Sequence, residues 1–238
     1  VTDLEAAVYI ESKEGETLGP FPATGEFLET DAAYASLTTT GDPDAATHLY
    51  TADVDIPSEG EWRFYVMLRD ADGNLSLTRA IGPPPVVGDE ETAAIPDVGD
   101  RAPEISTPTA EDVGGDLSEI DTRQPPDTQH EVDFADVLGK EPVVLSFATP
   151  ALCTSRVCGP VVDIAEQVKG ERPEDATFVH MEIWEDNDVN KGPRRQVLDY
   201  GLVTEPWLFV IGSDGKVVER LEGAYSATEL NAALDAAS

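Results

Sequence analysis

Two cysteines, Cys153 and Cys158, are the side chains of this sequence best suited to chemistry. They stand five positions apart, and the 238 residues hold no third cysteine. Thiol or disulfide chemistry must therefore use this pair, or thiols supplied by a partner. Two cysteines are too few for a fold held together by disulfides. The pair indicates either exchange of disulfides with another molecule or a single structural cross-link.

The spacing of the pair restricts its local structure. Along a regular helix, residues five apart are separated by about 7.5 Å of rise, whereas bonded cysteines have Cα atoms within roughly 7 Å of each other. Pro160 favours the first turn of a helix, so we expect a loop that ends near Cys158, followed by the helix. Unpaired N–H groups and the helix dipole stabilise a thiolate there, and Arg156 adds a positive charge. We expect the two cysteines to be bonded to each other.

The elements around the cysteines alternate between strand and helix patterns. A continuous apolar run before Cys153 is typical of a central strand that is covered on both faces. A Gly-Ser-Asp-Gly turn joins two later apolar runs into a hairpin. Ser226 and Glu229 form a capping-box pattern at the start of a closing helix. The sequence predicts strands at 142–147, 177–184, 207–211 and 216–221, and helices at 160–169, 194–200 and 227–236.

Four segments in this order resemble the thioredoxin superfamily, in particular its exported TlpA-like and peroxiredoxin-like branch. They are VGDRAPEI from Val98, FADVLGKEPVVLSFATP from Phe134, CTSRVCGP from Cys153 and YGLVTEPWLFVIGSDGKVV from Tyr200. The order β-α-β-α-β-β-α is the thioredoxin order. The cysteine motif departs from the family's usual Cys-Gly-Pro-Cys, because Val161 stands at the fourth position and the second cysteine lies upstream.

The resemblance implies thiol–disulfide exchange in which Cys153 and Cys158 are catalytic and no cofactor takes part. The partners would be protein thiols or disulfides of a redox partner. Pro206 matches the family's cis-proline, so we expect a cis bond between Glu205 and Pro206, close to the cysteines. The backbone of these two residues would then bind a substrate peptide.

Two other functions fit the same residues. The first is a non-catalytic binding or interaction protein outside the cytoplasm, in which the disulfide is a permanent cross-link. The second is a thiol peroxidase, because the Cys-x4-Cys spacing resembles that of Q-type peroxiredoxins. Cys153 would then be the peroxidatic residue, although Pro150 stands where those proteins carry threonine. The reduction potential separates exchange from a cross-link, since structural disulfides lie below about −300 mV.

A metal site is not expected from the sequence. His180 falls in a predicted strand and His130 in a polar stretch, and a lone strand histidine is more often a hydrogen-bonded core residue. Copper-binding members of the superfamily use two cysteines and a distant histidine, but nothing further supports that arrangement here. The acidic residues at 182–188 match no known calcium-ligand spacing.

The N-terminal part reads as strands joined by turns, with period-2 alternation at 48–56 and 62–68. The stretch LYTADVDIPSEGEWRFYVML resembles a motif of immunoglobulin-like domains in bacterial exported proteins. We expect an all-β immunoglobulin-like sandwich at 1–85, a proline-rich linker at 86–97 and an α/β thioredoxin fold at 98–238. A polar stretch at 107–131 is expected to be a long surface loop.

The charge is strongly negative, with 48 acidic against 15 basic residues and a formal net charge of −33. Such a field repels nucleic acid and anionic lipid, so neither is an expected partner. No run of about 18 apolar residues occurs. Because strand-like sequence begins almost at Val1, we expect a preceding signal or lipid-anchor segment, membrane contact through that segment alone, and a place outside the cytoplasm. The acidity has two interpretations: a solvated surface that keeps an exported protein in solution, or adaptation to a high-salt habitat.

The charge predicts that salt stabilises the fold. Self-repulsion among acidic groups opposes the compact state, and at 1 M salt the Debye length falls to about 3 Å. We expect the thermal midpoint to rise from low to high concentration of both NaCl and KCl. A midpoint that stays level in both salts would mean that the acidic surface is not repulsive.

Overall fold

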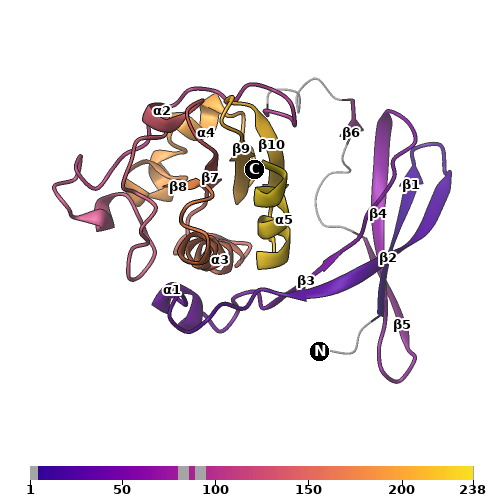
Figure 1. The fold of residues 1–238 in the computed structure, drawn as a ribbon. Coiled ribbons are helices and arrows are strands. Elements are labelled where there is room, and N and C mark those ends of the chain that lie inside the picture. Colours follow the sequence, from indigo (N-terminus) through magenta and orange to yellow (C-terminus); the bar gives the residue numbers. More distant parts are fainter. Residues whose placement is uncertain (1–4, 80–85, 89–94, 238) are drawn as a thin grey trace. The chain divides into compact units, whose positions relative to one another are not determined.

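The computed structural model describes residues 5–79, 86–88 and 95–237. The chain divides into two compact units (Figure 1). The first unit comprises Val1–Glu26 and His48–Ala93, and the second comprises Phe27–Thr47 and Ala94–Ser238. No helix in the described part of the chain is long and apolar enough to cross a membrane.

The first unit is built from an antiparallel sheet. Its strand order is β3-β2-β1-β4-β5, and β6 pairs with β4. Ile10 and Trp62 are its fully buried apolar residues, and the Trp62 indole donates to the Ser58 carbonyl at 3.0 Å. The bounds are β1 Glu5–Ser12, β2 Thr17–Phe27, β3 His48–Thr51, β4 Gly60–Arg69, β5 Leu75–Arg79 and β6 Val86–Val87.

The immunoglobulin-like sandwich expected for this part is not confirmed. A sandwich needs two sheets packed face to face, and the described strands of the unit all join one sheet. Residues 86–87, expected in the linker, form a short strand of this unit. The prolines expected to stiffen the linker, at 83–85, lie outside the described residues.

The second unit has a four-stranded sheet of order β10-β9-β7-β8. β7 runs parallel to β8 and antiparallel to β9, while β9 and β10 form a hairpin. This is the element order expected from the sequence, and it confirms the thioredoxin-like fold of this unit. The bounds are β7 Val143–Phe147, β8 Thr177–Met181, β9 Trp207–Ile211, β10 Val217–Glu222, α2 Phe134–Val137, α3 Cys158–Glu171, α4 Arg195–Asp199 and α5 Ala227–Ala237.

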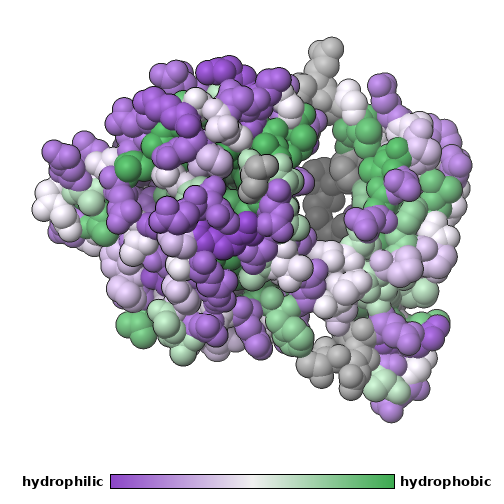
Figure 2. Space-filling model, in the orientation of Figure 1, coloured by the Kyte–Doolittle hydropathy of each residue, from purple (hydrophilic) through white to green (hydrophobic). Residues whose placement is uncertain are grey.

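Both faces of this sheet are covered, which explains why β7 and β9 are buried along their whole length and, apart from Ser146, apolar. On one face, Phe134 of α2 and Tyr200 after α4 pack with Phe147 and Phe209 of the sheet. Helices α3 and α5 contact each other and the other face (Figure 1). Side chains of α3 therefore reach the buried strands, while hydrophilic residues predominate on the visible surface of the unit (Figure 2).

Residues 27–47 belong to the second unit although the chain enters and leaves them through strands of the first. They carry a short helix, α1 Leu37–Thr40, which contacts α3. Gly159 of α3 is small for this reason, because a Cβ there would lie 2.8 Å from the Thr39 hydroxyl. The sequence did not predict this docking.

One buried carboxylate joins this segment to the rest of the unit. Asp163 of α3 accepts hydrogen bonds from the Ser36 backbone at 2.9 Å and from the Arg123 guanidinium at 2.8 Å. The Asp163 and Arg123 side chains are 1% and 5% exposed. A charge buried this deeply needs a partner of opposite sign. This carboxylate therefore connects three parts of the unit: residues 31–42, the loop that contains Arg123, and α3.

The buried ion pair of Asp163 and Arg123 predicts that Asp163→Asn lowers stability strongly. The substitution leaves the Arg123 guanidinium buried without its counter-charge, so we expect the free energy of unfolding to fall by about 3–5 kcal/mol in urea titrations. Asp175→Asn is the matched control, since it removes a carboxylate from a partly exposed pair with Arg172 and should cost at most about 1 kcal/mol. Equal losses in the two variants would contradict this account.

Candidate functional site

Cys153 and Cys158 form a disulfide, as expected, with Cα atoms 6.0 Å apart. The pair lies in the connection between β7 and α3. α3 begins at Cys158 itself, two residues before the start predicted from Pro160, so this sulfur belongs to the first residue of a helix of 14 residues. Arg156 lies between the cysteines in the left-handed region, with φ of 64°. The intervening residues are irregular, which confirms the predicted loop.

The two sulfurs differ in their access to solvent. Cys158 is fully buried and packs with Ala148 and Val162, whereas Cys153 is 9% exposed. The Ser155 hydroxyl lies 3.1 Å from the Cys153 sulfur. A thiol that approaches from solvent would therefore meet Cys153 first.

Residues 27–47 contact the cysteine loop on one side. The Arg156 guanidinium pairs with Asp42 at 2.6 Å, and its carbonyl accepts from the Ala46 backbone at 3.0 Å. The Arg156 charge expected to support a thiolate is thus engaged by a carboxylate. Hydrogen bonds from Asp44 and Arg156 lower the pKa of Asp42, which keeps that carboxylate ionised.

Two hollows border the cysteine loop. One, of about 420 Å³, is lined by the α1 segment together with Cys153, Arg156 and Pro160. The other, of about 560 Å³, is lined by Thr154, Ser155, Trp184 and residues 202–205 among others. The second hollow offers apolar walls next to the cysteine loop, as a site for an extended peptide would.

The peptide bond between Glu205 and Pro206 is cis, as the sequence predicted. The structure also brings the Glu205 side chain to the cysteines. A carboxylate oxygen of Glu205 and the sulfurs of Cys153 and Cys158 all lie within 4.8 Å of one another. The sequence assigned Glu205 a backbone role, and the approach of its carboxyl group to the disulfide was missed.

The surroundings of Glu205 favour its neutral form. Burial, followed by the negative charge of Glu182, raises the pKa of Glu205 to about 7. Its Oε2 atom is buried and has no hydrogen-bond partner among the described residues. A carboxyl group that changes charge near neutral pH therefore lies beside the disulfide.

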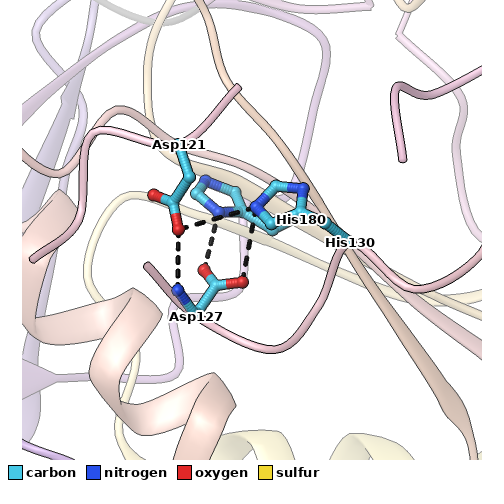
Figure 3. Close-up of side chains that lie close together, drawn as sticks. All are labelled: Asp121, Asp127, His130 and His180. Carbon is cyan, nitrogen blue, oxygen red and sulfur yellow. Dashed lines mark hydrogen bonds and ion pairs between the residues drawn. The ribbon is translucent and has the colours of Figure 1, made fainter. Parts of the chain in front are cut away.

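A second polar cluster lies in the interior of the same unit (Figure 3). Asp121, Asp127 and His130 come from the long polar loop and His180 from β8, and all four are at most 2% exposed. His180 Nδ1 lies 2.8 Å from Asp127, and His130 Nε2 lies 3.4 Å from Asp127 and 3.6 Å from Asp121. The sequence identified the two histidines separately and missed the aspartates, whose one signal was the clustering of Asp and His at 121–130.

Backbone groups hold the cluster in place. Asp121 accepts from the backbone of Arg123 and of Asp127, both at 2.7 Å. His180 Nε2 lies 3.1 Å from the Ala148 carbonyl, to which it must donate. Burial alone would lower the pKa of His180, but the charge of Asp127 and its hydrogen bond outweigh burial and raise it.

No protein-family model matches the chain, and no curated protein matches it. Among solved structures it is similar to a putative thiol:disulfide interchange protein, DsbE, from Chlorobium tepidum. The identity is 19% over 58% of this chain and 99% of the other, with a TM-score of 0.39. It is also similar to MTB DsbF, solved in mixed oxidized and reduced forms, with 22% identity over 57% of this chain and 96% of the other, and a TM-score of 0.38.

The raised pKa of Glu205 predicts a pH-dependent stability. In the unfolded chain the carboxyl ionises near the ordinary glutamate pKa of 4.5, whereas in the folded protein it stays neutral up to about pH 7. The folded state therefore binds the proton more tightly, and the free energy of unfolding falls as pH rises between these values. We expect Glu205→Gln to remove this component of the slope in urea titrations from pH 4 to 8. Glu104→Gln, at an exposed position, should leave the slope unchanged; a parallel slope in both variants would contradict the assignment.

Proposed function

We propose that this protein is a thiol–disulfide oxidoreductase that exchanges disulfides with thiols of partner proteins through Cys153 and Cys158. The observation that carries the proposal is the place of the disulfide. Its inner sulfur, on Cys158, belongs to the first residue of α3, and its outer sulfur, on Cys153, is the more exposed. Disulfides at helix N-termini are reactive because the departing thiolate is stabilised there.

In the oxidising direction, a partner thiolate attacks the Cys153 sulfur. A new sulfur–sulfur bond forms, the Cys153–Cys158 bond breaks, and Cys158 leaves as a thiolate. A second thiol of the partner, once deprotonated, then attacks the partner sulfur of the mixed disulfide and releases Cys153. The partner gains a disulfide and loses two electrons, which the cysteine pair takes up together with two protons. The reverse sequence reduces a partner disulfide.

The Glu205 carboxyl supplies the proton that this chemistry needs at the buried sulfur. A thiolate released at Cys158 is shielded from solvent, and a neutral carboxyl within 4.8 Å can protonate it. In the reverse direction, the Glu205 carboxylate takes the proton from the Cys158 thiol before attack. A proton-transfer group works best when its pKa lies near the working pH, and that of Glu205 is about 7.

The partner is a polypeptide in this proposal. The hollow of about 560 Å³ beside Ser155 and Glu205 has room for an extended segment. The backbone of Glu205 and Pro206 would pair with it. A disulfide persists outside the cytoplasm, and we place the protein there.

A permanent cross-link is the second candidate function, and the low exposure of both cysteines favours it. A structural disulfide resists reduction by glutathione, whereas one that exchanges does not. The two functions therefore differ in a quantity that can be measured on the full chain.

The deciding experiment is equilibration of the chain in glutathione redox buffers, with free thiols counted by mass tagging. We expect a reduction potential above about −300 mV, as for working exchangers. A value below it, together with no exchange with a short synthetic peptide that carries a free thiol, would assign the pair to a cross-link.

The order of attack is tested with single-cysteine variants. We expect Cys158→Ser to accumulate a mixed disulfide at Cys153 when treated with a peptide disulfide, and Cys153→Ser to react far more slowly because Cys158 is fully buried. Glu205→Gln should slow exchange and abolish the component of the pH–rate profile that titrates near pH 7, while Glu104→Gln should keep both. Equal trapping by the two cysteine variants would overturn the proposed order.

A further inference from the structure

We propose that Asp121, Asp127, His130 and His180 bind a divalent transition-metal ion, with zinc as the ion to use as a probe. The site is separate from the cysteines and goes beyond the proposed exchange chemistry. Each residue offers one ligand atom, and the four atoms lie within 4.8 Å of one another. Figure 3 shows the four side chains pointing toward a common point.

The ligand atoms lie close enough together for a tetrahedral site. Zinc binds nitrogen and oxygen at about 2.0–2.2 Å, which places tetrahedral ligands about 3.3 Å from each other. His180 Nδ1 is 2.8 Å from Asp127 Oδ2, while His130 Nε2 is 3.4 Å from Asp127 Oδ1 and 3.6 Å from Asp121 Oδ2. With one ligand atom taken from each residue, all four lie within 4.8 Å of one another, so small side-chain rotations would bring them around an ion.

The state of His130 is the second, independent indication of a ligand. Its side chain is 2% exposed, and neither ring nitrogen has a hydrogen-bond partner among the described residues. A buried polar group without a partner costs free energy. Its Nε2 faces the carboxylates of Asp121 and Asp127 at distances too long for good hydrogen bonds. A cation between the three groups would give His130 Nε2 a partner and bind both carboxylates.

The two nitrogen and two oxygen ligand atoms indicate which kind of ion would bind. Two imidazoles suit zinc and neighbouring transition metals, whereas calcium and magnesium prefer oxygen ligands throughout. Two carboxylates and two neutral imidazoles carry a charge of −2, which a divalent cation neutralises. Four protein ligands in a buried place leave no open coordination position, which is typical of a structural zinc site.

Hydrogen bonds behind three of the four ligands, His180, Asp121 and Asp127, already orient these side chains as a metal site needs. A metal-binding histidine usually donates its other ring N–H to a carbonyl or carboxylate, which fixes the free nitrogen toward the metal. His180 does this through Nε2 and the Ala148 carbonyl, so that Nδ1 points into the cluster. Backbone N–H groups of Arg123 and Gln129 likewise hold the carboxylates of Asp121 and Asp127.

A bound ion would join three parts of the second unit. Asp121, Asp127 and His130 belong to the polar loop, His180 belongs to β8, and Ala148 lies between β7 and the cysteine loop. The ion would fix the loop to the sheet beside the residues that lead to Cys153. Its role is to position this loop.

The test uses the full chain with its disulfide intact, so that free thiols cannot bind the metal. The chain is stripped with a chelator and dialysed against zinc, and bound zinc is counted by elemental analysis. We expect one equivalent per chain, a rise of the thermal midpoint with zinc but not with magnesium, and the visible absorption of tetrahedral cobalt after substitution. X-ray absorption should give nitrogen and oxygen neighbours at about 2.0–2.2 Å.

Two variants locate the ion. His130→Gln removes a ligand from the loop and should weaken zinc binding by at least about tenfold. His48→Gln is the matched control, because it removes the one remaining histidine of the chain, in β3, and should keep full binding. Equal zinc binding by the two variants would overturn the proposal. So would a folded wild-type chain that binds no zinc, since the cluster would then be an ion-pair network alone, and this result does not depend on how the variants fold.

Discussion

The buried carboxylate of Asp163 is the contact on which the arrangement of the second unit rests. It lies on α3, five residues after Cys158, and binds both Arg123 and the backbone of Ser36. Removing two charges from water is costly unless they pair closely and their remaining hydrogen bonds are satisfied. The Arg123 guanidinium meets this condition, because it also donates to the carbonyls of Pro125 and Tyr34. In a chain with 15 basic against 48 acidic residues, one of the few cations is held in the interior.

This pairing sets the surroundings of the disulfide. With α3 held against residues 31–42, Arg156 in the cysteine loop meets Asp42, and Thr39 lies against Gly159. Residues 31–42, more than a hundred positions earlier in the sequence, therefore line one side of the region around Cys153. Cys153 itself lines the hollow on this side, and the neighbouring Thr154 and Ser155 line the hollow that contains Glu205.

The parts of the fold that follow local rules could be predicted from the sequence. The central strands are apolar apart from Ser146, and the capping box at Ser226 and Glu229 forms as expected, with reciprocal hydrogen bonds at 2.9 and 3.1 Å. The disulfide and the cis bond before Pro206 also follow, because short motifs carry them. The predicted strand at 177–184 ends at Met181, where the chain turns.

The features that the sequence did not predict are polar contacts between residues that lie far apart in the chain. The docking of residues 27–47 depends on contacts across more than a hundred positions, which no periodicity encodes. The histidine–aspartate cluster draws three residues from a stretch whose composition is typical of a solvated loop. The same stretch contains Arg123, whose pairing with Asp163 is likewise visible in three dimensions alone. The carboxyl of Glu205 was assigned no role because the family motif concerns the backbone at that position.

The carboxylate of Glu182 interacts electrostatically with both polar sites of this unit, with His180 in the buried cluster and with Glu205 beside the disulfide. It directly follows the end of β8 and accepts a hydrogen bond from the Thr122 backbone at 2.7 Å. Burial raises the pKa of Glu182, and the positive charge of His180 opposes that rise. The negative charge of Glu182 in turn raises the pKa of Glu205. The proton affinity of the carboxyl beside the disulfide is thus set partly by Glu182, two residues after His180 in sequence. Strand β8 supplies a histidine to the buried cluster, and the residue that directly follows it tunes the group that would move protons at the cysteines.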